Sequence, residues 1–385
     1  MSEVELELEL ESRVIEGALD ASPGSVDMDE SQLIKLDAHI QRLIEAEKLQ
    51  GGSYLVARHG KIVAWRSMGA LTGTTGTGEL LPDAIMKISS ITKAFTAVSI
   101  VKLIEDGKLY LDQPVATILK EFDNPTHRDI TLFHLLTHTS GIMPVSGYYN
   151  EPYPRPWWGQ NGMDDWIAKQ LQGTLACEPG TAYNYSGAGF SLLGEVIRRV
   201  SGQSYESYVI ENLIEPLQLR RTFFQVPAHL HSEVLTISQY DLDALNDQED
   251  EDPRYPPRSA SGLYSTLYDL WKFSQMLLNG GTFEGIRILG RKSVEMLTKR
   301  HLFQVPAYHW GGKVKDKGHA LGIDLAIDHM SYESIGTYQM EGAGRSAMFV
   351  DPVENLIVTF FVPSNYSWIP ESVLGTKQII WSSLK

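Results

Sequence analysis

The hydrophobic period of this 385-residue chain changes twice, from strand-like to helical and back. Two strand patterns near the start, at 53–58 and 61–66, flank His59-Gly60, which predicts a tight hairpin. Helical spacing then dominates to about residue 300, and after about residue 318 the period returns to two. Strands at both ends with helices between them predict one mixed α/β domain built from both ends of the chain, with a mostly helical insertion. The late strand patterns cover 321–327, 338–342, 346–350 and 356–362.

Helix patterns flank these strands and fill the middle of the chain. Two segments interrupt them and are predicted to be loops: 147–159 is rich in proline and aromatic residues, and 241–252 carries seven acids and no base. The predicted helices cover 31–49, 90–105, 114–119, 132–137, 164–171, 188–200, 205–213, 266–278 and 370–383.

Charge and cysteine content exclude several classes of function. The chain has 33 Lys and Arg against 48 Asp and Glu, a net charge of −15, and therefore lacks the cationic field that nucleic-acid binding needs. Ten acids and one base lie in residues 1–30, which predicts a flexible acidic tail over 1–28. Cys177, the one cysteine, allows no internal disulfide and no cysteine cluster for a metal. The start of the chain does not resemble a signal peptide and no apolar run reaches 18 residues, so we expect a soluble, cytoplasmic protein without a membrane partner.

Ser90 and Lys93 stand three residues apart at the start of an apolar helix pattern. Residues at this spacing share one face of a helix, so the Lys93 ammonium is expected beside the Ser90 hydroxyl. The free N–H groups of a first helical turn point at an oxyanion forming on a carbonyl bonded to Ser90. A lysine in a confined site can lose its proton near neutral pH and draw the serine proton. Taken alone, the pattern fits either a nucleophile or a serine that caps a helix.

Four sequence blocks give this pair a wider context. In order, MKISSITKAFTAVSIVKLIEDGKLYLDQPV, ITLFHLLTHTSGI, EPGTAYNYSGAGFSLLGEVIRRVSGQSYESYV and SASGLYSTLYDLWKFSQMLLNGG resemble the serine β-lactamase-like superfamily, over about residues 30–365. The nearest branch holds class C β-lactamases, DD-peptidases and family VIII carboxylesterases. The resemblance implies a mixed α/β domain, with a central antiparallel sheet flanked by helices, plus an all-helical domain, the active site lying between them. We assign 29–110 and 260–385 to the sheet domain and 111–259 to the mostly helical domain.

The resemblance also implies roles for single residues. Ser90 corresponds to the acylated nucleophile and Lys93 to its activating partner. Tyr185 falls on the family's Tyr-x-Asn element, where it acts as a phenolate or a proton shuttle. Counting back from Asp351-Pro352 places the third element on Met340-Glu341-Gly342, so the backbone N–H groups of Ser90 and Ala343 would form the oxyanion hole.

The chain departs from the family pattern at two positions that bind substrate. Gly187 replaces the asparagine of the second element, and Met340 replaces the lysine or histidine of the third. Each lost charged hydrogen bond is worth on the order of 1.5–3 kcal/mol, which disfavours β-lactams and acyl-D-Ala-D-Ala. Glu341 either faces the pocket and pairs with a substrate ammonium or faces solvent, as strand alternation favours. Arg345 either replaces the missing cation or is solvated.

Aromatic side chains of the 147–159 loop are further candidates for substrate binding. Because the family's corresponding segment lines the site, Tyr149, Trp157 and Trp158 are predicted either to form an aromatic wall of the cleft or to pack as a surface loop. His134 and His138 have the spacing of a zinc pair but no H-E-x-x-H glutamate, and we interpret them as core histidines.

We therefore predict a cofactor-independent serine hydrolase that acts on a small-molecule ester or simple amide through a Ser90 acyl-enzyme. The alternatives are acyl transfer to a natural-product acceptor, a D-amino-acid peptidase or aminopeptidase in which Glu341 binds an amine, and a non-catalytic family member. The oligomeric state stays open.

Overall fold

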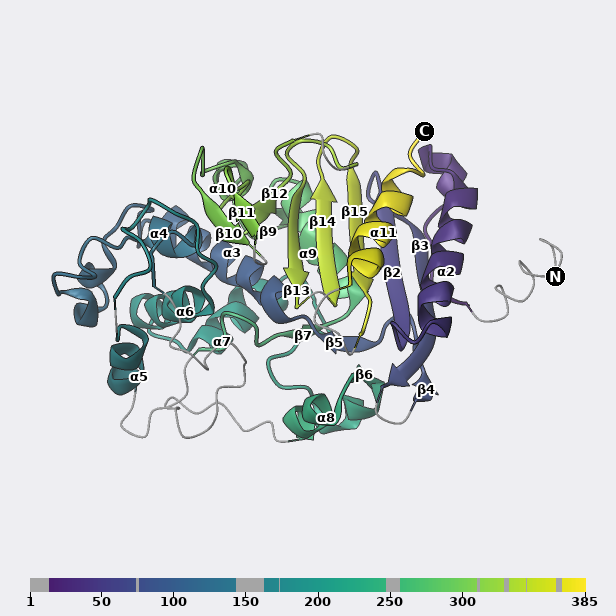
Figure 1. Ribbon diagram of the computed structural model, residues 1–385, viewed down its shortest axis with the longest axis horizontal. Coiled ribbons are helices and arrows are strands. Elements are labelled where there is room, and N and C mark those ends of the chain that lie inside the picture. The colour runs from purple at the N-terminus through teal and green to yellow at the C-terminus, as the bar shows by residue number, and fades with distance from the viewer. Residues whose placement is uncertain are drawn as a thin grey trace.

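A computed structural model describes residues 14–73, 76–142, 163–172, 174–246, 257–309, 312–328, 332–343, 345–364 and 369–385. Its centre is an eight-stranded sheet in the order β1-β3-β2-β15-β14-β13-β12, with β4 paired to β3 (Figure 1). Neighbouring strands of this sheet are antiparallel. The strands are β1 (Ile15–Glu16), β2 (Gly51–Arg58), β3 (Lys61–Thr72), β4 (Thr77–Glu79), β12 (Asp324–Leu325), β13 (Tyr338–Gly342), β14 (Ser346–Asp351) and β15 (Leu356–Phe361).

The two ends of the chain meet inside this sheet. Strand β2 from the early hairpin pairs with β15 from the end of the chain, with Val56 opposite Val358. The hairpin turns at His59 and Gly60, whose φ angles of 54° and 75° are those of a two-residue turn that matches the twist of its strands. The prediction of a sheet built from both chain ends is confirmed.

Helices cover both faces of the sheet and form two hydrophobic cores. Helices α2 (Glu30–Glu45) and α11 (Pro370–Trp381) pack side by side on one face, over a core that includes Tyr54, Ala347 and Phe349. Helix α9 (Leu267–Leu278) packs against β2, β14 and β15 on the other face (Figure 1). The core on the α9 side continues through α3 (Thr92–Glu105) into the helical part of the molecule.

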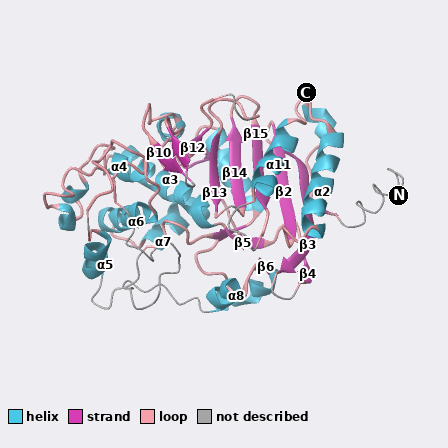
Figure 2. Ribbon diagram, in the orientation of Figure 1, coloured by secondary structure: helices cyan, strands magenta, loops and turns pink. Residues whose placement is uncertain are grey.

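Helices gather beside the sheet in a part of the molecule that holds none of the strands of the large sheet (Figure 2). The α-helices here are α4 (Leu132–Leu136), α5 (Met163–Gln170), α6 (Gly187–Ser201) and α7 (Tyr205–Val209), which a π-helical turn, η6 (Ile210–Ile214), continues. The boundaries that we assigned to the two domains stay predictions. The other helical elements are η1 (Pro23–Val26), η2 (Ser89–Ile91), η3 (Val115–Thr117), η4 (Lys120–Phe122), η7 (Ala228–Glu233), α8 (Gln239–Asn246) and α10 (Arg291–Thr298), and the small strands are β5 (Ile85–Lys87), β6 (Val234–Leu235), β7 (Tyr264–Ser265), β8 (Thr282–Phe283), β9 (Ile286–Arg287), β10 (Ala307–His309) and β11 (Gly312–Val314).

Three local expectations differ from the structure. Residues 14–28, which we predicted as part of the tail, belong to the folded part, since Ile15 pairs with Ser67 and Met28 is buried. The first residues of the acidic segment that we predicted as a loop belong to helix α8. Asp241, in the first turn of this helix, accepts a hydrogen bond from the backbone N–H of Ser238, which directly precedes the helix. The strand predicted over 321–327 is shorter in the structure, where β12 covers Asp324–Leu325 and Gly322 (φ 72°) bends the chain before it.

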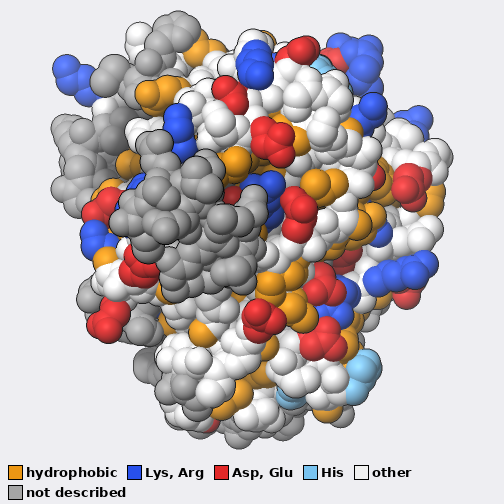
Figure 3. Space-filling view, turned by 90° about the vertical axis from the view of Figure 1, so that its right-hand side faces the viewer, with side chains coloured by type: hydrophobic (Ala, Val, Ile, Leu, Met, Phe, Trp, Pro, Cys, Tyr) orange, Lys and Arg blue, Asp and Glu red, His pale blue; other side chains and the backbone are white. Residues whose placement is uncertain are grey.

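The surface on the side that carries α2 has side chains of both charges. Lys and Arg side chains are interspersed there with Asp, Glu and apolar side chains (Figure 3). Within the described part of the chain, no helix combines the length and the apolar character needed to cross a bilayer.

Candidate active site

Ser90 lies in the short turn η2, directly before helix α3. The preceding residue, Ser89, has a φ angle of 47°, in the left-handed region that non-glycine residues seldom occupy. Backbone strain of this kind costs on the order of 1–3 kcal/mol and is concentrated at functional sites. The turn holds Ser90 half-buried at the start of a helix, where backbone N–H groups lack intrahelical partners.

Lys93 is 2% exposed, and its ammonium lies beside Ser90. Its Nζ donates to Ser90 Oγ at 3.1 Å and to the carbonyl oxygen of Ala260 at 2.7 Å. The same Nζ lies 4.8 Å from the centre of the Tyr185 ring and 5.7 Å from that of Phe190. The predicted contact between the two residues of the S-x-x-K pattern is present.

Tyr185 completes a three-residue constellation around Ser90 Oγ. Its hydroxyl donates to Ser90 Oγ at 2.6 Å from a position 95 residues further along the chain. Ser186, the next residue, caps helix α6 by accepting a hydrogen bond from the N–H of Gly189. Tyr185 is 38% exposed, whereas Lys93 is almost completely buried.

The segment that carries Ala260 is fixed to the start of α3 by hydrogen bonds. Thr96 Oγ1 donates to the Ser259 carbonyl at 2.7 Å, and the Leu263 N–H donates to Thr92 Oγ1 at 3.1 Å. The backbone carbonyl that holds Lys93 is therefore itself held in place. Sequence analysis did not identify this role, although the SASG block that carries the resemblance contains Ala260.

The end of strand β13 lies against the η2 turn. A side chain on Gly342 would collide with the Ile88 carbonyl and with Ser346, so only glycine permits this approach. Ser346 Oγ donates to the same Ile88 carbonyl at 3.3 Å. Ala343, exposed and with a φ angle of 52°, follows at the turn into β14. The predicted third element is thus adjacent to the Ser90 turn.

Gly187 and Met340, the two departures from the family pattern, lie in different surroundings. Gly187 is the first residue of α6, two positions after Tyr185, and a Cβ atom placed there would meet no atom within 4 Å. Met340 is buried in the core on the α3 side of the sheet. An open space therefore exists where the family has an amide, and an apolar side chain where it has a cation.

Glu341 lies on the face of its strand opposite Met340, as alternation predicts, but neither Glu341 nor Arg345, just beyond the third element, is fully solvated. Glu341 pairs with Ala347 and faces the α11 side of the sheet, away from Met340. It is half-buried rather than solvated, and burial and nearby Asp324 raise the pKa of its carboxyl above the usual range. Arg345 is also half-buried, and burial lowers the pKa of its guanidinium.

The remaining candidates are three aromatic residues of the 147–159 loop and the two histidines interpreted as core residues. Tyr149, Trp157 and Trp158 belong to 143–162, which the structure does not describe, so their role stays a prediction. His134 caps helix α4 together with Thr131. His138 lies beyond the end of that helix, buried against Tyr185.

Residues 36–371 match the family model described as Beta-lactamase. The chain belongs to this family. Protein Rv1367c of Mycobacterium tuberculosis is 27% identical over 362 residues, covering 84% of this chain and 88% of that protein. Esterase EstB of Burkholderia gladioli is 30% identical over 220 residues, covering 53% of this chain and 54% of EstB.

A solved structure confirms the predicted fold class. EstCE1, described as a hydrolase with promiscuous acyltransferase activity, superposes with a TM-score of 0.70 at 19% identity, covering 91% of this chain and 99% of EstCE1. The β-lactamase-like arrangement of an antiparallel sheet with helices is therefore the fold of this chain.

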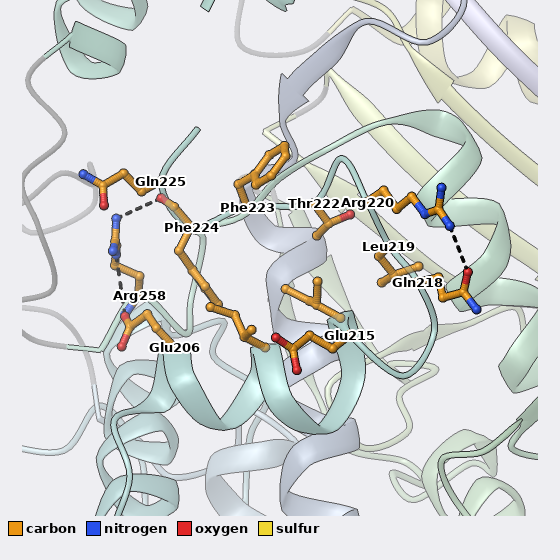
Figure 4. A pocket seen from close by; sticks show the side chains of 12 residues that line it. Glu206, Glu215, Gln218, Leu219, Arg220, Thr222, Phe223, Phe224, Gln225 and Arg258 are labelled. Atoms are coloured by element: carbon orange, nitrogen blue, oxygen red, sulfur yellow. Dashed lines mark hydrogen bonds and ion pairs between the residues drawn. The ribbon is translucent and has the colours of Figure 1, made fainter. Parts of the chain in front are cut away.

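A separate hollow lies between α7–η6 and the 218–225 segment, and none of its lining residues belongs to the Ser90 constellation (Figure 4). Arg258 closes one end of it, donating from its guanidinium to the Phe224 carbonyl at 2.9 Å and from its backbone N–H to Glu206 at 2.8 Å. Because Arg258 stands two residues before Ala260, this anchoring also fixes the segment that holds Lys93.

Proposed function

We propose that this protein is a serine hydrolase that cleaves an ester or simple amide through an acyl-enzyme on Ser90. The observation that carries the proposal is the convergence on Ser90 Oγ of Lys93 Nζ at 3.1 Å and the Tyr185 hydroxyl at 2.6 Å. A serine is a weak nucleophile unless neighbouring groups take its proton, and these two groups stand within proton-transfer distance.

The reaction follows from these positions. Lys93, in its neutral form, takes the proton of Ser90 as Oγ attacks the substrate carbonyl. Tyr185, the more exposed of the two partners, gives its hydroxyl proton to the departing alcohol or amine and regains a proton from Lys93, which becomes neutral again. The backbone N–H groups of Ser90 and Ala343 stabilise the oxyanion. Water then attacks the acyl carbonyl and gives a proton to neutral Lys93. The bond between the acyl group and Ser90 Oγ breaks, and Ser90 Oγ takes this proton as the acid leaves.

Two features support neutral esters or simple amides as substrates. The family's asparagine and cation are replaced by Gly187 and Met340, which offer no side-chain hydrogen bond to a substrate amide or carboxylate. The relative EstB is named as an esterase and is 30% identical over the region it shares with this chain. Because Glu341 lies on the α11 side of the sheet, an aminopeptidase that binds its substrate amine through this carboxylate is less well supported.

The test compares wild type with Ser90→Ala, using intact mass after treatment with a fluorophosphonate and release of p-nitrophenol from p-nitrophenyl acetate. We expect a stoichiometric adduct and hydrolysis in wild type, and neither in Ser90→Ala. Ser201→Ala, a half-buried serine at the end of α6, is the matched control and should keep both. A folded wild-type protein without adduct would instead support a non-catalytic family member.

Lys93→Ala and Tyr185→Phe extend the same assay to the proton-transfer groups. Each should slow acyl-enzyme formation by at least ~10²-fold, the loss expected for a missing general acid or base. A near-wild-type rate in either variant removes that residue from the mechanism. Product analysis with an added alcohol separates hydrolysis from acyl transfer, since a transferase forms the new ester in preference to the free acid.

A further inference from the structure

His138 holds the residues on both sides of Tyr185. Its Nδ1 accepts a hydrogen bond from the Ser186 N–H at 3.0 Å, and its carbonyl oxygen accepts one from the Asn184 N–H at 2.8 Å. Its ring lies against the Tyr185 ring, with 4.6 Å between centroids and 32° between planes. His138 thus sets the direction of the Tyr185 side chain. The Phe190 ring packs against the His138 ring, with 4.9 Å between their centroids.

This arrangement requires His138 to be neutral and protonated at Nε2. A ring nitrogen that accepts a hydrogen bond carries no proton, so the proton of the neutral ring is on Nε2. Burial, followed by the neighbouring His319 and Lys93, lowers the pKa of His138 well below its usual value. The charged and titratable groups facing it are Lys93, Tyr183, Tyr185, Lys317, His319 and Asp324.

A second buried histidine, His319, lies next to His138, and its ring nitrogens have hydrogen-bonding roles that complement those of His138. His319 Nδ1 lies 2.7 Å from Asp324 Oδ1, and Lys317 Nζ lies 3.0 Å from the same oxygen. Burial alone raises the pKa of Asp324, but Lys317 and His319 outweigh it and hold that pKa well below its usual range. Ionised Asp324 therefore accepts from His319 Nδ1–H. When the His319 ring is neutral, this pairing leaves its Nε2 as an acceptor.

The His138 ring offers a donor, Nε2–H, toward the His319 ring, whose Nε2 can accept. Their centroids are 5.5 Å apart, and His319 Nε2 is buried without a hydrogen-bond partner among the described residues. A buried acceptor without a partner costs on the order of 1–3 kcal/mol, so the site favours a donor facing it. The Nε2–H of His138 is such a donor, and since it makes no direct hydrogen bond to His319 Nε2, one water molecule would connect the two rings.

We propose that His138 is a positioning residue that holds the Tyr185 hydroxyl on Ser90, and that the Asp324–His319 pair keeps His138 in its neutral, Nε2-protonated form. This rests on the proposed hydrolase function. His138 does not touch the substrate; it acts through Tyr185 alone.

Two substitutions of His138 distinguish the effect of its accepting nitrogen, Nδ1, from the effect of its aromatic ring. His138→Asn places a carbonyl oxygen where Nδ1 accepts from Ser186, and asparagine tolerates the φ angle of 55° found at this position. His138→Phe keeps the ring but leaves the Ser186 N–H without its acceptor. We expect kcat for p-nitrophenyl acetate to fall by about 10- to 100-fold in His138→Phe, with little change in KM, since a displacement of about 1 Å costs up to ~10² in rate.

His138→Asn should recover kcat to within about threefold of wild type, the margin expected when geometry is preserved. His127→Asn is the matched control: His127 is also buried, its Nδ1 is bound to Asn124, and it lies outside the site. A folded His138→Phe with wild-type kcat overturns the proposal, as does a folded His138→Asn with a tenfold loss. Absence of the Ser90 adduct in wild type would refute the function itself, which none of these outcomes does.

A second measurement needs neither activity nor the Phe variant. Long-range ¹H–¹⁵N correlation spectra of ¹⁵N-histidine-labelled protein at pH 7, assigned with His138→Asn and His319→Gln, report which ring nitrogen carries the proton. We expect His138 protonated at Nε2 only and His319 at Nδ1. A proton on His138 Nδ1 contradicts the proposal, and an unchanged His138 spectrum in Asp324→Asn contradicts the part played by the Asp324–His319 pair.

Discussion

The candidate site depends on three side chains, of which Ser90 and Lys93 are close in sequence and Tyr185 is distant. Ser90 and Lys93 are adjacent because residues three apart on a helix share a face, and this contact was predictable. Tyr185 was identified only through the family resemblance. The Ala260 carbonyl that holds Lys93 comes from 167 residues away, and no periodicity in the sequence encodes such a contact.

At this scale the open space beside Gly187 leads to a prediction about specificity. Gly187→Asn introduces the amide that the family uses to bind substrate, at a position where a Cβ atom meets no atom within 4 Å. We expect the variant to fold with a melting temperature close to that of wild type and to gain acylation by a β-lactam such as nitrocefin, because one neutral amide hydrogen bond contributes about 0.5–1.5 kcal/mol.

The readout is the rate of nitrocefin acylation relative to p-nitrophenyl acetate hydrolysis. Gly187→Ala, which adds the Cβ atom without the amide, is its control. A Gly187→Asn variant that hydrolyses the ester normally but acylates no faster with nitrocefin would mean that other features exclude β-lactams. Met340→His is a poorer test, since it places a polar ring in the apolar core.

At the scale of elements, segments with a regular hydrophobic period were predictable, and the helix within the acidic segment was not. The strand predicted over 338–342 coincides with β13, and the helix predicted over 370–383 begins with α11 at Pro370. Helix α8 was missed because seven acids suggested a loop, whereas Ser238 and Asp241 stabilise its first turn. The acidic composition of this segment therefore did not predict its structure, because the hydrogen bonds between Ser238 and Asp241 stabilise a helix there.

The contact between β13 and the Ser90 turn leads to a prediction about Gly342. Gly342→Ala forces the strand away from Ile88, so we expect a loss of about 1–3 kcal/mol in the free energy of unfolding, as for overpacking. Displacing Ala343 with it should lower kcat by up to ~10²-fold, the cost of losing an oxyanion-hole donor. Gly24→Ala, where a Cβ atom meets nothing within 4 Å, should change neither urea denaturation nor kcat. Equal effects in both variants would rule out this role for the close approach.

At the scale of the whole molecule, burying histidines makes stability depend on pH. Burial lowers the pKa of His127, His134, His138 and His301. In the unfolded chain these groups bind protons below about pH 6.5, while the folded protein binds fewer. Because the unfolded state then holds more protons, the free energy of unfolding falls as pH decreases below ~6.5 and is fully retained above it.

His138→Asn isolates one of these groups, since asparagine does not titrate. Urea denaturation at intervals from pH 7.5 to 5.0 should give a shallower loss of stability in the variant than in wild type. The difference approaches ~1.4 kcal/mol per pH unit, the value for a single proton. Asp37 and Asp269 act in the opposite direction, because burial raises their pKa values, but they are the same in both proteins and cancel from the difference. Parallel curves would mean that His138 takes up its proton at the same pH in the folded protein as in the unfolded chain. That result contradicts a folded state that disfavours the protonated ring, as expected from its burial and from Nδ1 accepting from Ser186.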